Sequence, residues 1–191
     1  MASLKRSRWL DPLSIRSLMP EPTKIKDVYL KPGELHFGGA DTRIRTLLGS
    51  CVALVFWHPQ RQLGGMCHYL LPTRSKGHKV SDRLDGHYGD EALALLLQAI
   101  QMSGTQPSEF TLRVFGGGNM FPGIARNEKD HIGLQNVKAA KRLLQAHGLV
   151  CSACHVEGVG HRRLSFSIWD GEVKLEQSPP VQAPPRQRDR L

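Results

Sequence analysis

This chain of 191 residues has no long hydrophobic run, and it contains few cysteines and few aromatic residues. No apolar stretch approaches the roughly 20 residues of a membrane-spanning helix, so we expect no membrane insertion. The basic residues near the N-terminus are not followed by an apolar segment, so we expect no secretory signal. Four cysteines without such a signal indicate reduced thiols, and we expect a cytoplasmic protein.

Two common ligand-binding motifs are present only in part. The glycines at 116–118 follow an expected strand and permit close approach of a ligand, but no Lys-Ser or Lys-Thr of a P-loop follows them. Cys151 and Cys154 have the spacing of half a zinc site, yet the second pair of ligands is missing. In a regular strand these two side chains would also point to opposite faces. We therefore expect no metal site.

The charge of the chain is strongly positive, with 26 lysines and arginines against 17 aspartates and glutamates and a net charge of +9. The basic residues are spread along the chain, and no dense basic run with interleaved aromatics occurs. Nucleic-acid binding is therefore the least favoured interpretation, and we expect none. A solvated basic surface and a surface that attracts an acidic protein partner both remain open.

The apolar pattern divides the chain into an N-terminal arm at 1–26, a core domain at 27–176 and a proline-rich tail at 177–191. Amphipathic periodicity predicts helices at 89–102 and 132–147. The run 52–57 is apolar throughout and fits either a buried strand or the first turns of a helix. Short apolar segments predict strands at 27–30, 35–37, 43–48, 110–115, 149–156 and 163–169. This mixture indicates a layered α/β or α+β domain.

Cys51 and His68, which lie 17 positions apart, are the residues best suited to chemistry. Cys51 follows a glycine turn at Gly49, and His68 lies on the next apolar segment. If the two segments lie side by side, the imidazole can take the thiol proton and produce a nucleophilic thiolate. Backbone N–H groups around Ser50 and Cys51 are candidates for an oxyanion hole. A buried, unreactive Cys51 is the alternative, because cysteine is among the most buried residue types.

Several sequence blocks around and beyond this pair occur together in one known family. In chain order they are LGSCVA at 48–53, GGMCHYLLP at 64–72, YGD at 88–90, FGGGNMF at 115–121 and IGLQNV at 132–137. With these blocks, the region 27–176 resembles the chemoreceptor glutamine deamidase family, CheD. The resemblance implies an α+β fold, a layered α/β/β sandwich of mixed sheets with two main covering helices.

The resemblance also implies an activity. Members of the family are cytoplasmic cysteine hydrolases that convert particular glutamines of chemoreceptors to glutamate and release ammonia, and receptor methyl esters are further candidate substrates. The family's nucleophile matches Cys51 and its base matches His68, with no metal or organic cofactor. The implied partners are the cytoplasmic region of chemoreceptors and a phosphatase of the CheC kind. The loop residues Gly117, Gly118 and Asn119 are candidates to help stabilise the oxyanion.

Two positions depart from the family pattern. The family's threonine, which orients the histidine, is expected where Arg45 stands, one position before Thr46. Thr46 and Ser50 are therefore the candidates for this role, and Thr46 is preferred. A glycine-rich pattern near the C-terminus is altered at Glu157 and His161. If such changes abolish activity, the chain is instead a catalytically weak regulatory or binding module of the chemotaxis system.

Overall fold

Two mixed β-sheets and two α-helices build the part of the chain that this computed structural model describes, residues 20–75, 83–120 and 131–179. In spatial order, the four-stranded sheet consists of β1 (Lys26–Tyr29), β3 (Thr42–Leu48), β8 (His161–Ser167) and β9 (Val173–Ser178). The five-stranded sheet consists of β2 (Leu35–Gly38), β5 (Leu63–Cys67), β4 (Val52–His58), β6 (Thr111–Gly116) and β7 (Cys151–Val156).

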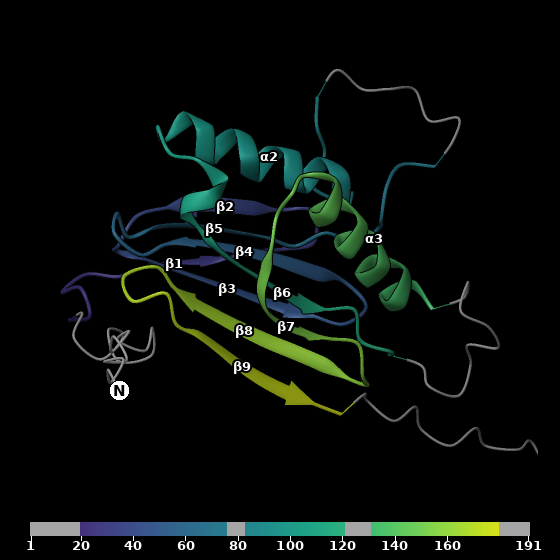
Figure 1. Cartoon of the computed structure of the whole chain (residues 1–191). Helices are drawn as coiled ribbons and strands as arrows, with labels where there is room; N and C mark the ends of the chain where they lie inside the picture. The colour runs from purple at the N-terminus through teal and green to yellow at the C-terminus, as the bar shows by residue number, and fades with distance from the viewer. Residues whose placement is uncertain (1–19, 76–82, 121–130, 180–191) are drawn as a thin grey trace, which may run out of the picture.

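The helices α2 (Gly89–Met102) and α3 (Ile132–Ala146) lie on one face of the five-stranded sheet, and the four-stranded sheet lies on its other face (Figure 1). The predicted α+β layered fold is confirmed. Among the residues described, no helix is both long and apolar enough to cross a membrane. Residues 1–19 of the expected arm and 180–191 of the expected tail lie outside the described ranges.

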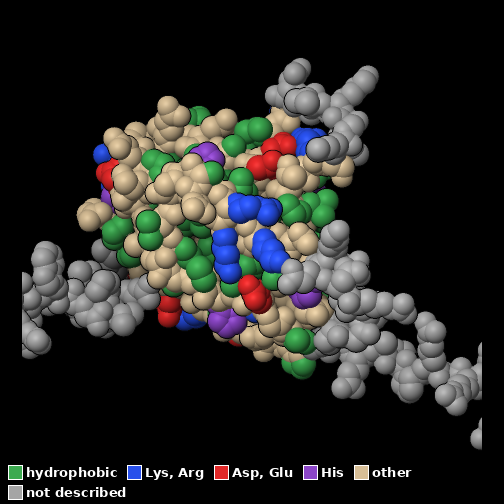
Figure 2. All heavy atoms as spheres, turned by 45° about the vertical axis from the view of Figure 1, so that its right-hand side comes forward, with side chains coloured by type: hydrophobic (Ala, Val, Ile, Leu, Met, Phe, Trp, Pro, Cys, Tyr) green, Lys and Arg blue, Asp and Glu red, His purple; other side chains and the backbone are tan. Residues whose placement is uncertain are grey.

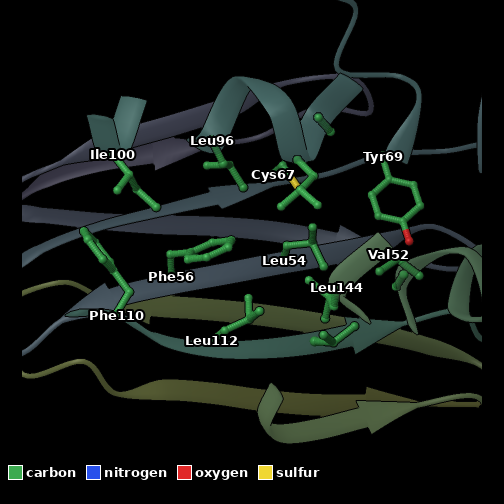
Figure 3. Close-up of a cluster of buried hydrophobic side chains, with 14 of the residues drawn as sticks. Val52, Leu54, Phe56, Cys67, Tyr69, Leu96, Ile100, Phe110, Leu112 and Leu144 are labelled. Atoms are coloured by element: carbon green, nitrogen blue, oxygen red, sulfur yellow. The ribbon is translucent and has the colours of Figure 1, made fainter. Parts of the chain in front are cut away.

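Strand β4 forms the centre of the molecule and is buried on both of its faces. Val52, Leu54 and Phe56 point toward the helices, within the cluster of apolar side chains that Figure 3 shows. Ala53 and Val55 point the other way, into the core between the two sheets. A strand buried on both faces needs no polar alternation, so its sequence is continuously apolar. The ambiguous run at 52–57 is therefore a strand.

Both predicted helices form, because each presents an apolar stripe to the five-stranded sheet. Helix α2 has the expected bounds and buries Leu93, Leu96 and Ile100. Helix α3 ends one residue earlier than expected, at Ala146. Gly148 follows it with a φ of 64°, a left-handed conformation that favours glycine and terminates helices.

Strand β7 corrects the prediction that Cys151 and Cys154 point to opposite faces. The strand pairs in parallel with β6, with Leu112 opposite Cys151 and Arg113 opposite Ala153, so one extra residue forms a β-bulge. The bulge shifts the alternation, and Cys154 comes to lie opposite Val114. Both cysteines therefore lie on the face that Leu112 and Val114 share, the side covered by the helices.

Candidate active site

Cys51 lies immediately before β4, on a short turn that the glycine-rich loop holds in place. The N–H of Gly117 donates to the carbonyl of Cys51 at 2.7 Å, and the N–H of Gly118 donates to the carbonyl of Gly49 at 2.9 Å. The Cys51 side chain is partly exposed. The turn thus presents its thiol where a substrate can reach it, while the backbone behind the thiol is fixed.

The loop in turn rests against the start of α3, and two glycines make this close approach possible. A Cβ atom on Gly133 would lie 2.5 Å from the carbonyl oxygen of Gly117. A Cβ atom on Gly117, whose φ is 67°, would lie 2.3 Å from the Val137 side chain. Side chains at either position would push α3 away from the loop that supports Cys51.

The register of the sheet brings Cys51 and His68 to the same face. Val52 and Tyr69 exchange two backbone hydrogen bonds of 3.1 and 3.0 Å. Cys51 and His68 each precede one member of this antiparallel pair, so they are diagonal neighbours, about 7–8 Å apart at the backbone and within reach of their side chains. Cys51 packs against the core between the sheets, so this shared face is the one toward the four-stranded sheet.

Thr46 reaches His68 from the opposite sheet. Its hydroxyl oxygen lies 2.7 Å from Nδ1 of His68 and 2.9 Å from the carbonyl oxygen of Leu30. A hydroxyl has one proton, which it donates to the Leu30 carbonyl because that oxygen can only accept. The hydroxyl therefore accepts from His68, which fixes the proton on Nδ1 and leaves the lone pair of Nε2 available. Nε2 is buried and has no hydrogen-bond partner among the described residues.

Arg45, which occupies the position where the family resemblance predicts a threonine, points away from His68. Its guanidinium donates to the Tyr29 hydroxyl at 3.0 Å and pairs with Asp27 at 3.1 Å on the outer face of the four-stranded sheet. Successive residues of β3 face opposite sides, so Thr46 points inward. The other candidate, the Ser50 hydroxyl, makes no hydrogen bond within the described part of the chain.

Burial favours the neutral forms of both Cys51 and His68. It lowers the pKa of His68 to about 4, and it raises the pKa of the Cys51 thiol. The backbone N–H of Cys51 offsets part of the effect on its thiol. At neutral pH the site therefore holds a thiol and an unprotonated imidazole, so the imidazole can act as the base when a substrate arrives.

The pKa of His68 also predicts how stability depends on pH. In the unfolded chain this histidine takes up a proton below its ordinary value of 6.5, whereas in the folded chain it does so only near 4. The contribution of the neutral His68 to the free energy of unfolding is thus fully present above about pH 6.5. It is lost as the pH falls toward about 4, and the total loss is up to about 3 kcal/mol. Urea unfolding at about pH 7 and about pH 5 should show a larger loss in the natural protein than in His68→Gln. Equal losses would contradict this prediction.

The three loop amides are not available for the oxyanion role predicted for Gly117, Gly118 and Asn119. The first two support the Cys51 turn, and the N–H of Asn119 donates to the carbonyl of Gly158 at 2.7 Å. By contrast, the N–H of Cys51 donates to no other described residue and lies beside its own sulfur. The loop amides thus position the cysteine, and the Cys51 amide is the better candidate donor.

Asn136 is a supporting residue that the sequence reasoning missed. It is fully buried on α3, and its side-chain amide donates to the carbonyls of Ser50 at 3.0 Å and Leu70 at 2.7 Å. The Tyr69 hydroxyl donates to the backbone carbonyl of Asn136 at 2.8 Å. One side chain thus joins the segments of both Cys51 and His68 to the helix. The signal in the sequence was a polar residue directly before Val137, on the inward side of α3.

Replacing Asn136 with leucine should therefore destabilise the protein by about 2–4 kcal/mol, because two buried carbonyls lose their donor. Urea unfolding measures this difference as a shift of the midpoint. The exposed Gln145 on the same helix provides the control, and we expect Gln145→Ala to change stability by less than about 0.5 kcal/mol. An Asn136→Leu variant as stable as Gln145→Ala would show that the carbonyls do not depend on this amide.

Metal binding has no evident place at the site. Within the described ranges, no group of three or more histidine, cysteine or acidic side chains could hold a metal ion. Cys67, next to His68, points instead into the apolar cluster under the helices (Figure 3) and is fully buried. Burial raises the pKa of the Cys67 thiol to about 12, so it is inert near neutral pH.

A layered α+β domain that presents a partly exposed cysteine on the same sheet face as a hydrogen-bonded histidine defines a class, the candidate cysteine hydrolases. A family model described as CheD chemotactic sensory transduction matches residues 70–177. The "Probable chemoreceptor glutamine deamidase CheD 3" of Dechloromonas aromatica (strain RCB) is 44% identical over 154 residues, 81% of this chain and 89% of the relative. The chain belongs to the CheD family.

Other relatives with related names are similar over most of their length. The "Probable chemoreceptor glutamine deamidase CheD" of Pseudomonas fluorescens (strain SBW25) is 42% identical, over 84% of this chain and 90% of the relative. The "Probable chemoreceptor glutamine deamidase CheD 1" of Leptospira interrogans serogroup Icterohaemorrhagiae serovar copenhageni (strain Fiocruz L1-130) is 36% identical, over 82% of this chain and 96% of the relative. The resemblance found in the sequence blocks is thus confirmed.

Proposed function

We propose that this chain is a protein-glutamine deamidase, a cysteine amidohydrolase that converts glutamine side chains of chemoreceptors to glutamate and releases ammonia. The observation that carries the proposal is the hydrogen bond from His68 to Thr46, which leaves Nε2 of His68 unprotonated on the face that Cys51 shares. The relatives, which are named chemoreceptor glutamine deamidases, support the substrate.

The first half of the reaction forms a thioester. Nε2 of His68 takes the proton of Cys51, and the thiolate attacks the carboxamide carbon of the glutamine. The N–H of Cys51 donates to the resulting oxyanion. The protonated His68 then gives its proton to the leaving nitrogen, and ammonia departs.

The second half consumes one water molecule. Nε2 of His68 takes a proton from the water, whose oxygen attacks the thioester carbon. The thioester breaks, glutamate is released, and the proton returns to the Cys51 sulfur. A receptor methyl ester would react in the same way with methanol as the leaving group, so methylesterase activity is a second expected reaction. No step requires a metal or an organic cofactor.

A basic surface favours encounter with the acidic receptor segments that we propose as partners. The chain has a net charge of +9, and basic side chains gather on the face that carries α3 (Figure 2). Lys141 and Arg142 of this helix are exposed. Opposite charges accelerate association at low ionic strength, and salt screens them. The reaction belongs on the cytoplasmic side, where we also place a CheC-like phosphatase as a second partner.

The proposal is tested by incubating the protein with the cytoplasmic fragment of a chemoreceptor. Peptide mass spectrometry should show the small mass increase of an amide replaced by a carboxylate at particular glutamines, with a matching release of ammonia. We expect the apparent KM for the receptor fragment to rise as salt is added, because screening weakens the encounter. Absence of deamidation with every receptor of the source organism would refute the proposal.

A further inference from the structure

Cys151 and Cys154 form a pair of thiols far from Cys51 in the sequence and on the other face of the five-stranded sheet. The β-bulge in β7 places both on the side of the helices, opposite Leu112 and Val114 of β6. Cys51 packs instead toward the core between the sheets. The proposed deamidation uses neither thiol of this pair, so their proximity has no explanation in that reaction.

The pair lies at the wall of a groove between α3 and β7. The groove has a volume of about 350 Å³, and both cysteines line it together with Ala140, Lys141 and Leu144 of the helix. Strand β7 is the last strand of its sheet, so no other strand of the described residues pairs with its outer side. A small molecule can therefore approach the two sulfurs without disturbing the core.

The two thiols interact with each other and differ in access. Cys154 is exposed, whereas Cys151 is partly buried and lies with its sulfur 3.2 Å from the carbonyl oxygen of Ala153. Burial, followed by the hydrogen-bonding contact with Cys154, raises the pKa of Cys151 to about 11. Cys154 is thus the thiol that meets a reagent first. Cys151 is the neighbouring thiol that resolves the product, slowly near neutral pH because its raised pKa keeps most of it protonated, and faster as the pH rises.

The bulge also sets a separation that a disulfide can span. Three residues of regular strand cover roughly 10 Å, which is too far for a disulfide. In this protein Cys151 lies opposite Leu112 and Cys154 lies opposite Val114, and these two residues of β6 are only two positions apart. The Cα atoms of the two cysteines are therefore separated by roughly 6.6 Å along the strand. Disulfides normally join Cα atoms between about 4.4 and 6.8 Å apart, so this separation lies at the upper end of the usual range.

We propose that Cys151 and Cys154 form a reversible intramolecular disulfide. With a small-molecule disulfide as oxidant, the Cys154 thiolate attacks one of its sulfurs and releases one thiol. The Cys151 thiolate then attacks the Cys154 sulfur of the mixed disulfide and releases the second thiol. Two protein thiols are thereby oxidised and one small disulfide is reduced to two thiols, so atoms and electrons balance.

This redox site would lie on the strand that lines a groove beside α3, the helix whose Asn136 holds the carbonyls of Ser50 and Leu70. The pair differs from the two other cysteines in its exposure to solvent or in the face of the sheet on which it lies. Cys67 is fully buried, and Cys51 faces the opposite core. Products at the pair can therefore be assigned by peptide mass without ambiguity.

The test is to treat the full-length folded protein with excess oxidised glutathione, block free thiols with iodoacetamide and map the peptides by mass. We expect the peptide that contains both cysteines to lose the mass of two hydrogen atoms and to resist alkylation until it is reduced. Cys151→Ser should instead retain glutathione on Cys154, because the resolving thiol is missing. Cys154→Ser should react more slowly and form no such bond.

Three results would overturn the proposal. They are glutathione on both cysteines with no internal bond, two thiols that stay free while Cys51 is modified, and a Cys151→Ser variant that loses glutathione as fast as the natural protein. None of these results bears on deamidation, which is measured on the receptor fragment, so the two proposals can fail independently. Circular dichroism of the serine variants checks that their fold is retained.

Discussion

Replacing Cys51 with alanine should abolish deamidation of a chemoreceptor fragment. The proposed reaction passes through a thioester on this sulfur, and none of the other described thiols lies on the face that His68 shares. Loss of a nucleophile costs far more than loss of a binding contact, so we expect kcat to fall by about 10⁴-fold or more. The measurement is the mass of the target peptides after incubation with equal concentrations of variant and natural protein.

Cys51→Ser provides the matched control for shape. A hydroxyl fits the space of the thiol, but it is a much weaker nucleophile without a stronger base, so this variant should also be inactive. Both variants should keep the urea midpoint of the natural protein to within a small shift, because Cys51 is partly exposed. Deamidation at the natural rate by Cys51→Ala would eliminate the thioester mechanism and leave a binding module with some other catalytic group.

Much of the fold was predictable because local patterns and tertiary burial agree. Helix α2 shows this well, since its apolar stripe and the residues at its ends predicted the bounds that it has. Strand β4 was ambiguous for a physical reason: both of its faces are buried, so the alternation that normally identifies a strand is absent. Neighbouring strands also made the Cys51–His68 pairing predictable, because β4 and β5 are consecutive and antiparallel.

The other contacts of the site depend on chain segments that only the tertiary fold brings together. Thr46 belongs to the four-stranded sheet and meets His68 across the core, a contact that no spacing within one sheet could reveal. Asn136 comes from a helix on the opposite side of the five-stranded sheet. These two residues approach the Cys51–His68 pair from opposite layers. Thr46 was therefore predictable only through the family resemblance, and Asn136 was missed.

Two further features could not be predicted from the sequence, a local irregularity of a strand and the burial of a charged side chain. The bulge in β7 reverses the expected relation of Cys151 and Cys154, and nothing in the residue pattern marks it. Arg162 and Arg163 look alike in the chain, yet Arg162 is 1% exposed and donates to Nδ1 of His155 at 3.0 Å. Arg163 instead extends into solvent beside Glu176. A count of charges therefore overstates the basic surface that a partner meets.

The Thr46 hydroxyl is the contact whose removal should separate the positioning of His68 from the presence of the nucleophile. Thr46→Val keeps the shape of the side chain but leaves Nδ1–H of His68 without its acceptor and the carbonyl of Leu30 without its donor. The imidazole then loses both its fixed tautomer and its orientation toward Cys51. We expect kcat to fall by about 10²-fold, with little change in KM, and stability to fall by about 1–3 kcal/mol.

Two variants make this prediction specific. Thr46→Ser retains the hydroxyl and should recover most of the activity, whereas a purely structural role for the methyl group would leave it as impaired as Thr46→Val. Ser50→Ala should stay near the natural rate, because no hydrogen bond joins the Ser50 hydroxyl to His68 in the described part of the chain. The rate at which iodoacetamide alkylates Cys51 at neutral pH gives a readout without the receptor, and it should fall in Thr46→Val along with kcat. If Thr46→Val retained both rates while Ser50→Ala lost them, the orienting role would belong to Ser50, and the hydrogen bond from His68 to Thr46 would be structural only.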